Sequence, residues 1–441
     1  MHFLTRNLDH PFRKLVAFFL CWKILLLLVA LCSPGPGYDT SGSLTEDSHK
    51  KELPVFLRYV LGKLIRWDAI YFIKVSERGY LFEQEWAWGW GFTRVIAFST
   101  EFLRHVGQLH YERLEALVAI FIAHIAHLFS VLLLFRLSLA VFPGSPRSFA
   151  FTTALLHVIS PAGLFLSAPY AESSCALLSF AGCLLFVKSL GHNGQSATHD
   201  LYLLISGILF GAATTFRSNG ILNGLLLLEE ALRTLLLLRY DLGTAVLRRL
   251  FAAGLGGMGV ALGFLLPQYI AYQEYCQSID IAPRIWCQKP LPSIYTFVQS
   301  HYWNVGLFRY WTVSNSPLFV LAIPMFAILT VSAVWAFSYV SGKGFPQATK
   351  TDGAKASEIA LTEGETNVIC NMAVSQLILV VLTSTTAHVQ IITRISSAYP
   401  VWLWYLAMFA REGKLPSMFV KFMVLYGLIQ GGLYASFLPP A

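Results

Sequence analysis

The sequence predicts an all-α protein that crosses a membrane many times. Of its 441 residues, 56% are hydrophobic and 13% are charged, and the mean hydropathy is +0.58. Soluble domains carry about 25% charged residues, whereas a helix that faces lipid needs no polar outer surface. The 11 Trp, 19 Tyr and 33 Phe suit the aromatic belts of membrane proteins. This composition excludes a soluble enzyme, a nucleic-acid-binding protein and a disordered scaffold.

The first predicted span is Phe12–Cys32, which follows Arg6 in a short basic segment. A cleaved signal peptide is the alternative interpretation of this segment. Its apolar run is long for a signal peptide, and no small-x-small cleavage site precedes Pro34 and Pro36. We therefore expect an uncleaved first helix with its N-terminus in the cytosol.

Residues 33–112 contain no clean span and are predicted to form a long first loop in the lumen. The loop opens with the Gly, Pro, Ser and Asp residues that are typical of irregular structure. Between Leu53 and Ile65, apolar residues recur at helical spacing with Arg58 and Lys63 among them. This pattern predicts a helix that lies in the plane of the membrane interface.

The rest of the chain contains ten further apolar runs, each close to the length of about 20 residues that a spanning helix needs. They are 113–142, 148–168, 171–190, 201–216, 218–238, 246–273, 317–340, 368–388, 393–410 and 417–437. We therefore predict eleven transmembrane helices in a single membrane domain, 1–441. For the pair 201–216 and 218–238, a re-entrant or interrupted segment stays an alternative.

The distribution of Lys and Arg supports one topology for these spans. With a cytosolic N-terminus, the loops at 143–147, 191–200, 239–245, 341–367 and 411–416 share the cytosolic side, and they hold most of the loop charges. The short turns on the opposite side hold only Arg217 and Arg394. The loops at 33–112, 169–172, 217–220, 274–316 and 388–394 then face the lumen, where all the polar motifs converge.

The net charge and the cysteines give no sign of nucleic acid or zinc. The charge of +8 is spread over many short loops, as is usual for cytosolic loops of membrane proteins. The seven cysteines show no CxxC or CxxH spacing. Cys276 and Cys287 lie close together in a polar stretch, where a luminal disulfide and two free thiols are both open.

Asp68 follows the predicted interfacial helix and is surrounded by aromatic residues, in the segment Arg66–Phe72. A carboxylate at the boundary between water and lipid can act as a general base that takes the proton from a sugar hydroxyl. The alternative is structural, because Asp is a preferred N-cap and Asp68 could cap a helix that begins at Ala69.

Several longer motifs follow one another from the first loop to near the end of the chain. They are Trp67-Asp68-Ala69, Glu83-Gln84-Glu85-Trp86-Ala87, Ser167-Ala168-Pro169-Tyr170-Ala171-Glu172, Arg217-Ser218-Asn219-Gly220, His301-Tyr302-Trp303-Asn304-Val305-Gly306 and His388-Val389-Gln390-Ile391-Ile392-Thr393-Arg394. In these residues and in their order, the chain resembles the PIG-V family of GPI mannosyltransferases.

This resemblance implies an endoplasmic-reticulum enzyme of the GT-C class of glycosyltransferases. Such an enzyme takes mannose from dolichyl phosphate mannose, and this family adds the second, α1,6-linked mannose to the precursor of the GPI anchor. An α product from a β-linked donor means inversion, which requires one general base. We assign that base to Asp68, with Glu83 and Glu85 as reserve candidates that could instead hold sugar hydroxyls or be solvated loop charges.

The leaving group would be an anionic lipid phosphate, so basic residues near the membrane surface are candidates to bind it. Arg217, Arg309 and Arg394 lie in three luminal segments, where a guanidinium can bind two phosphate oxygens. We favour Arg309, while snorkelling or pairing with Glu172 or Glu274 is the structural alternative. The other candidates for substrate binding are Trp67, Trp303, Asn304, His301 and His388.

We expect no metal or other cofactor, because the first loop contains no DxD pair and the donor has a single phosphate. Ser160–Ser173 is predicted to form a tight luminal turn with Glu172 near a helix N-terminus, and the donor's lipid chain is expected to enter near 53–65. The resemblance also suggests a small membrane partner subunit. A transporter, a non-catalytic scaffold and a dolichyl-phosphate-sugar transferase with another acceptor remain as alternatives.

Overall fold

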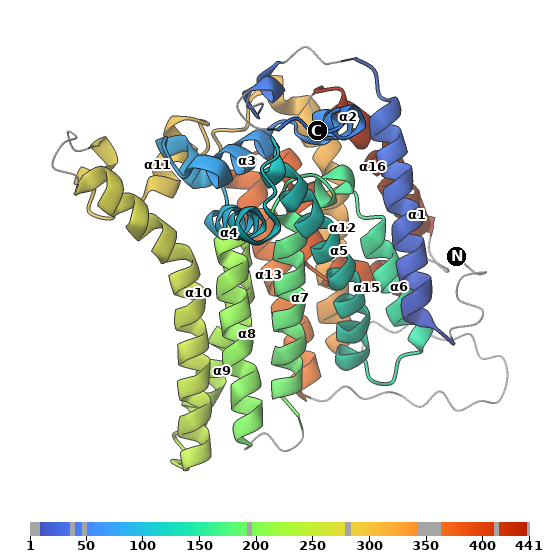
Figure 1. The fold of residues 1–441 in the computed structure, drawn as a ribbon. Helices are drawn as coiled ribbons and strands as arrows, with labels where there is room; N and C mark the ends of the chain where they lie inside the picture. The colour runs from blue at the N-terminus through green and yellow to red at the C-terminus, as the bar shows by residue number, and fades with distance from the viewer. Residues whose placement is uncertain are drawn as a thin grey trace.

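Long helices run side by side through the computed structural model of the chain (Figure 1). The structure describes residues 9–35, 40–45, 51–191, 196–277, 284–341, 363–409 and 414–438. These residues form no β-strand, and Lys51 and Tyr111 make one isolated parallel bridge. The predicted all-α class is therefore confirmed. Most of the predicted cytosolic loop 341–367 lies outside the described residues.

Within the described part, eight helices are long and apolar enough to cross a membrane. They are α1 (Pro11–Cys32), α5 (Leu114–Val141), α7 (Glu172–Ser189), α8 (Ala197–Phe216), α10 (Thr244–Cys276), α12 (Ser316–Val340), α13 (Glu363–Thr386) and α16 (Lys414–Ala435). Each of them matches a predicted span. The apolar runs are therefore good predictors of the helices that cross the bundle in one piece.

The remaining three predicted spans are broken into shorter pieces, so the count of eleven is not confirmed. The pieces are α6 (Arg147–Val158) and η3 (Gly163–Leu166); η4 (Ser218–Asn223) and α9 (Gly224–Leu237); and α14 (Ile392–Ile395), η8 (Ser396–Ala398) and α15 (Val401–Phe409). The first break follows Pro161 and includes Gly163 at φ +50°. The last precedes Pro400, which disfavours helical backbone at Tyr399.

The irregular backbone in these three breaks is tolerated inside the helix bundle because protein surrounds it or a cavity borders it. Phe165 and Tyr170 in the first break are buried, as are Trp402 and Trp404 in α15. Inside a membrane, unpaired backbone groups are tolerated only where they are shielded from lipid in this way. Apolar composition cannot reveal such breaks, because a segment buried in protein and a segment buried in lipid are equally apolar.

The first loop folds onto one end of the long helices. It contains η1 (Ser41–Thr45), α2 (Val55–Leu64), α3 (Asp68–Arg78), η2 (Glu83–Ala87) and α4 (Trp90–Gly107). Figure 1 shows α2 and α3 at this end together with α11 (Ile294–His301). The predicted helix within 53–65 is present as α2, whose Phe56 and Tyr59 are exposed while Leu61 and Leu64 are buried.

Glycines bring α8 and α10 into backbone contact. A Cβ atom on Gly207 would lie 2.2 Å from the Cα of Gly256, and one on Gly211 would lie 2.3 Å from the carbonyl oxygen of Gly259. Small residues of this kind let membrane helices pack closely. The contact fixes the C-terminal end of α8, which leads into Arg217.

We predict that Gly211→Ala pushes α8 away from α10 and lowers the free energy of unfolding by about 1–3 kcal/mol, as overpacking does in other cores. Gly257→Ala on α10 is the matched control, because no other atom lies within 4 Å of its added Cβ. The measurement is the thermal unfolding midpoint of the purified proteins in detergent. Equal midpoints for the two variants would contradict this account of the α8–α10 contact.

Candidate active site

Four charged side chains with alternating sign meet where the broken segments and the first loop come together. Both terminal nitrogens of Arg394 lie 3.2 Å from Oδ2 of Asp68. The Nε of Arg394 lies 3.1 Å from Oε1 of Glu172, and a terminal nitrogen of Arg217 lies 3.3 Å from the same oxygen. The sequence order is Asp68, Glu172, Arg217 and Arg394, so the fold brings together residues from four distant parts of the chain.

Asp68 is the first residue of α3 and follows the N-cap residue Trp67, and the hydrogen bonds to its carboxylate among the described residues come from Arg394. The alternative that Asp68 caps a helix beginning at Ala69 is therefore wrong, because the carboxylate bonds to Arg394 instead. The preceding residue, Trp67, has φ +54° and ψ −129°, a conformation that is costly for a residue with a side chain. Such strain is common where a local structure must aim a functional group.

Two neighbouring aromatic rings pack against Arg394, in addition to the carboxylates that it contacts. Its guanidinium carbon lies 4.4 Å from the centroid of the Phe165 ring and 5.2 Å from that of Tyr170. Burial by itself would lower the pKa of Arg394, but Glu172 and Asp68 outweigh that effect and keep the pKa above its usual range. The side chain therefore stays charged and oriented toward Asp68.

Glu172 is the residue of this group that sequence analysis did not assign to the site. It begins α7, as predicted, where the helix dipole favours a negative charge. Its side chain is 1% exposed and contacts two guanidinium groups. Arg217 and Arg394 therefore both form an ion pair with Glu172, as the structural alternative expected, and their contacts with substrate stay predictions. The sequence shows that Glu172 is an acidic residue at the start of an apolar run. Only the tertiary fold shows that Glu172 lies beside Arg217 and Arg394.

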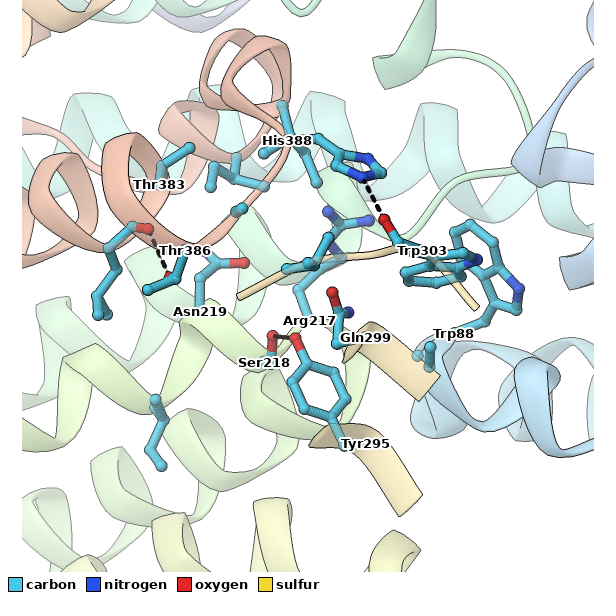
Figure 2. Close-up of a pocket in the computed structure, with 18 of the residues that line it drawn as sticks. Trp88, Arg217, Ser218, Asn219, Tyr295, Gln299, Trp303, Thr383, Thr386 and His388 are labelled. Carbon is cyan, nitrogen blue, oxygen red and sulfur yellow. Dashed lines mark hydrogen bonds between the residues drawn. The ribbon is translucent and has the colours of Figure 1, made fainter. Parts of the chain in front are cut away.

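A cavity of about 1100 Å³ opens beside these charges (Figure 2). Arg217, Ser218 and Asn219 face it from the segment after α8, and Gln299 and Trp303 face it from the second large loop. The cavity combines a polar end at Asp68 and the arginines with apolar side chains from membrane-spanning helices. These apolar residues include Phe264 of α10, Leu318 of α12 and Leu379 and Leu382 of α13.

Six of the predicted site residues line this cavity and five do not. Those that line it are Trp67, Asp68, Arg217, Trp303, His388 and Arg394. His388 lies with Nε2 3.5 Å from the carbonyl oxygen of Trp303, and burial lowers its pKa. It can therefore stay neutral while it contacts the loop that carries Trp303.

Arg309, His301 and Asn304 are exposed and lie outside the cavity lining. The Arg309 side chain packs back along Gly306, and the His301 ring stacks on Phe297 with 4.9 Å between centroids. Two of the aromatic residues that favoured Arg309, Phe308 and Trp311, are exposed, whereas Tyr310 contacts His388 and Gln390 of the cavity lining. Arg217 and Arg394 occupy the position at the cavity that was expected for Arg309.

Glu83 and Glu85 are buried within the loops and do not line the cavity. Oε1 of Glu83 accepts a hydrogen bond of 2.9 Å from the indole of Trp286, and Oε2 accepts one of 3.1 Å from Tyr302. Glu85 accepts from Arg78 and from two backbone amides. Neither is a solvated loop charge. Glu83 joins the first loop to the second large loop, and Glu85 holds parts of the first loop together.

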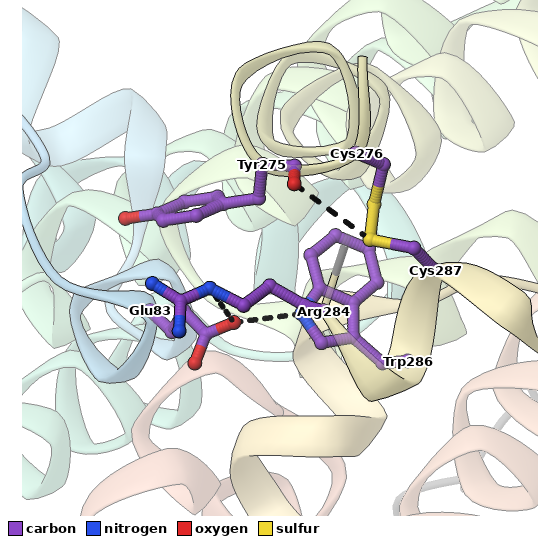
Figure 3. Close-up of a disulfide and its surroundings, with 6 residues drawn as sticks. All are labelled: Glu83, Tyr275, Cys276, Arg284, Trp286 and Cys287. Carbon is purple, nitrogen blue, oxygen red and sulfur yellow. Dashed lines mark hydrogen bonds and ion pairs between the residues drawn. A yellow bond between two sulfur atoms is a disulfide. The ribbon is translucent and has the colours of Figure 1, made fainter. Parts of the chain in front are cut away.

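A disulfide links Cys276, at the end of α10, to Cys287 in η5 (Ile285–Gln288) (Figure 3). The two Cα atoms are 5.6 Å apart, a usual separation for a bridged pair. Next to it, Trp286 is fully buried and bonds to Glu83 of the first loop. The bridge therefore anchors the contact between the two large loops, and it resolves the alternative that the sequence left open.

A buried lysine supports the turn beneath Arg394, and sequence analysis gave it no role. Lys23 lies within α1, where Nζ donates to the carbonyl oxygen of Leu166 at 2.9 Å and to the hydroxyl of Ser167 at 2.7 Å. These residues belong to the turn that carries Phe165 and Tyr170. A charged residue inside a membrane helix is costly and usually has a specific partner. Lys23 was detectable as the one cation in the middle of the first apolar run.

Comparisons with known proteins agree over nearly the whole chain. Residues 12–441 match a family described as Mannosyltransferase (PIG-V). The chain is 45% identical to the GPI mannosyltransferase 2 of Chaetomium globosum, over 98% of this chain and 97% of that protein. It is 40% identical to the GPI mannosyltransferase 2 of Aspergillus fumigatus, over 99% of this chain and 95% of that protein.

Solved structures of an oligosaccharyltransferase from Archaeoglobus fulgidus also align with the chain. The apo form is 11% identical with a TM-score of 0.42, over 96% of this chain and 55% of that one. A complex with an inhibitory peptide and a dolichol-phosphate has a TM-score of 0.39, over 95% of this chain and 55% of that one. The chain thus spans about half the length of these oligosaccharyltransferases.

We predict that Glu172→Gln lowers the free energy of unfolding by about 3–5 kcal/mol, as removal of one partner from a buried ion pair does. The amide keeps the shape of the side chain but leaves Arg217 and Arg394 without the carboxylate between them. Thermal unfolding of the purified protein in detergent measures the change. Glu101→Gln is the control, because Glu101 is exposed and its ion pairs are worth less than about 1 kcal/mol. An equal effect of both substitutions would refute the role given to Glu172.

Proposed function

The chain belongs to the PIG-V family of mannosyltransferases, and on that premise we propose that it transfers the second mannose of the GPI precursor from dolichyl phosphate mannose in α1,6 linkage. The observation that carries the proposal is the pairing of a partly exposed carboxylate, Asp68, with the largely buried Arg394, at a cavity that Arg217 also lines and that extends between apolar helices. Such a cavity can accept a sugar, an anionic phosphate and a lipid chain together.

Asp68 acts as the general base of an inverting transfer of the GT-C type. Both bonds from Arg394 go to Oδ2, and no donor among the described residues bonds to Oδ1. The side chain is 26% exposed, so Oδ1 can take the proton of the acceptor's 6-hydroxyl. As that oxygen attacks the anomeric carbon of the donor, the bond from this carbon to the phosphate oxygen breaks. The electron pair leaves with dolichyl phosphate.

Arg217 is the side chain best placed to bind the donor phosphate. It faces the cavity (Figure 2) and has a carboxylate partner, Glu172, at one terminal nitrogen. A guanidinium presents five N–H donors, so further donors remain for phosphate oxygens. Arg394 already donates hydrogen bonds from both terminal nitrogens to Asp68, and its Nε forms an ion pair with Glu172. We therefore assign Arg394 to the orientation of Asp68 and Arg217 to the leaving group.

The lipid chain of the donor lies against the apolar part of the cavity. Phe264, Leu318 and Leu382 line it and belong to three membrane-spanning helices. By contrast, no residue of α2 lines the cavity. The entry expected near 53–65 is therefore replaced by one between α10, α12 and α13.

The protein acts in the endoplasmic reticulum membrane with its site toward the lumen. The disulfide at Cys276 and Cys287 favours this side, because disulfides persist in oxidising compartments. Arg147 and Arg239 lie in turns on the other side of the predicted topology, in accord with the positive-inside rule. The small membrane partner subunit stays a prediction.

We predict that Asp68→Asn lowers kcat by at least about 100-fold, the range expected for loss of a general base. Microsomes that lack the protein should accumulate the GPI intermediate with one mannose, and wild type but not Asp68→Asn should restore the lipid with two. Asp241→Asn, an exposed residue between α9 and α10, is the matched control. Normal mannosylation by Asp68→Asn at equal protein level would instead favour a scaffold, and accumulation of a different lipid would favour another acceptor.

We also propose that transfer needs no divalent metal, because a single phosphate can be neutralised by a guanidinium. Purified enzyme treated with EDTA and dialysed should keep its initial rate within about twofold, a change that corresponds to well under 1 kcal/mol of activation free energy. A metal-dependent glycosyltransferase that uses a nucleotide sugar serves as the positive control. Loss of activity that manganese restores would overturn this proposal.

A further inference from the structure

Three aromatic rings form one wall of the cavity, and none of them has a part in the chemistry proposed above. Tyr71 stacks on Trp88 with 5.3 Å between ring centroids and an interplanar angle of 27°. Trp88 in turn contacts Trp303 at 5.2 Å (Figure 2). The three rings come from α3, from the segment after η2 and from the segment after α11, and all line the cavity. We call them the aromatic wall.

The aromatic wall begins one helical turn from Asp68. Residues three positions apart on a helix share a face, so Tyr71 and Asp68 face the same side of α3. Burial raises the pKa of Tyr71, and the nearby charges of Asp68 and Glu85 raise it further. A ligand that rests on this wall therefore has one edge at Asp68.

Two glycines fix the position of the wall against the end of α8. A Cβ atom on Gly89 would lie 1.9 Å from the carbonyl oxygen of Phe216, and one on Gly91 would lie 2.1 Å from the hydroxyl of Thr215. The backbone after Trp88 thus presses directly on the end of α8, immediately before Arg217. The segment Trp88-Gly89-Trp90-Gly91 can take this path only because alternate residues have no side chain.

The aromatic wall differs from the other aromatic surface of the site. Phe165 and Tyr170 hold the cation of Arg394, whereas no Lys or Arg of the described residues lies over Tyr71, Trp88 or Trp303. A neutral ring with an apolar face and a polar rim fits such a surface, because it buries its C–H face on the rings and keeps its hydroxyls free. A pyranose has this shape.

We infer that Tyr71, Trp88 and Trp303 form the subsite that binds the acceptor's sugar ring and holds its hydroxyl at Asp68. The inference rests on the proposed function, in which Asp68 takes the acceptor's proton and Arg217 holds the donor phosphate. The two substrates then meet at Asp68. The donor's sugar ring is the competing occupant, and the experiment separates the two.

The test is steady-state kinetics of the purified full chain, with the glycolipid bearing one mannose and dolichyl phosphate mannose varied separately. Tyr71→Ala and Trp88→Ala should each raise the KM for the glycolipid about tenfold or more, as truncation of an aromatic contact does in other interfaces. The KM for the donor should stay within about twofold. Trp88→Phe and Tyr71→Phe keep a ring and should stay close to wild type.

Trp311→Ala is the matched control, because Trp311 is exposed at the same end and lies outside the cavity lining. An equal rise in the donor KM, or no change in either KM, would overturn the inference. If either alanine variant fails to fold, as judged by thermal unfolding, Trp303→Ala on a separate element provides the same test. Wild-type enzyme that leaves the glycolipid unmodified, or full activity of Asp68→Asn, would refute the proposed function itself.

Discussion

The site depends on a row of alternating charges, Asp68–Arg394–Glu172–Arg217. Each charge is costly to bury alone, so each requires its neighbour. The row joins the first loop, the start of α7, the end of α8 and the broken segment before α15. The row lies where helices begin or end. Asp68 begins α3, Glu172 begins α7, Arg217 follows α8, and Arg394 lies in α14 of an interrupted span. The ends of these helices and the charged row are therefore two aspects of one constraint.

The sequence predicts well whatever depends on local composition. Eight apolar runs became continuous helices, and Asp68 was recognised because it stands among aromatic residues in a motif. The interruptions near Pro161 and Pro400 were not predicted, since hydropathy is equally high for segments buried in protein. Glu172 and Lys23 were missed as site residues for a related reason. Their partners lie far away in the sequence, and only the fold brings Lys23 to Leu166.

Arg309 shows how neighbours in sequence can mislead. Its flanking aromatic residues resemble a binding site, but Phe308 and Trp311 are exposed at the surface, where Trp311 bonds to the carbonyl oxygen of Ser384. Several aromatic residues that line the cavity instead occur in the first loop, beside glycines that allow the close approach of Trp88 to α8. For this site, the glycines that permit close backbone contacts indicate the cavity lining better than the number of aromatic residues in a segment does.

The buried Nζ of Lys23 has a consequence for how the protein is made. Its hydrogen-bond partner Leu166 lies 143 residues further along the chain. At a synthesis rate of about 5–20 residues per second, roughly 7–30 seconds separate the translation of the two residues. During that interval Lys23 lacks its partner, and a lysine at the centre of a membrane helix costs about 2.5–3.5 kcal/mol on insertion scales. The apolar residues on either side of Lys23 supply the compensating affinity for lipid until the later helices are made.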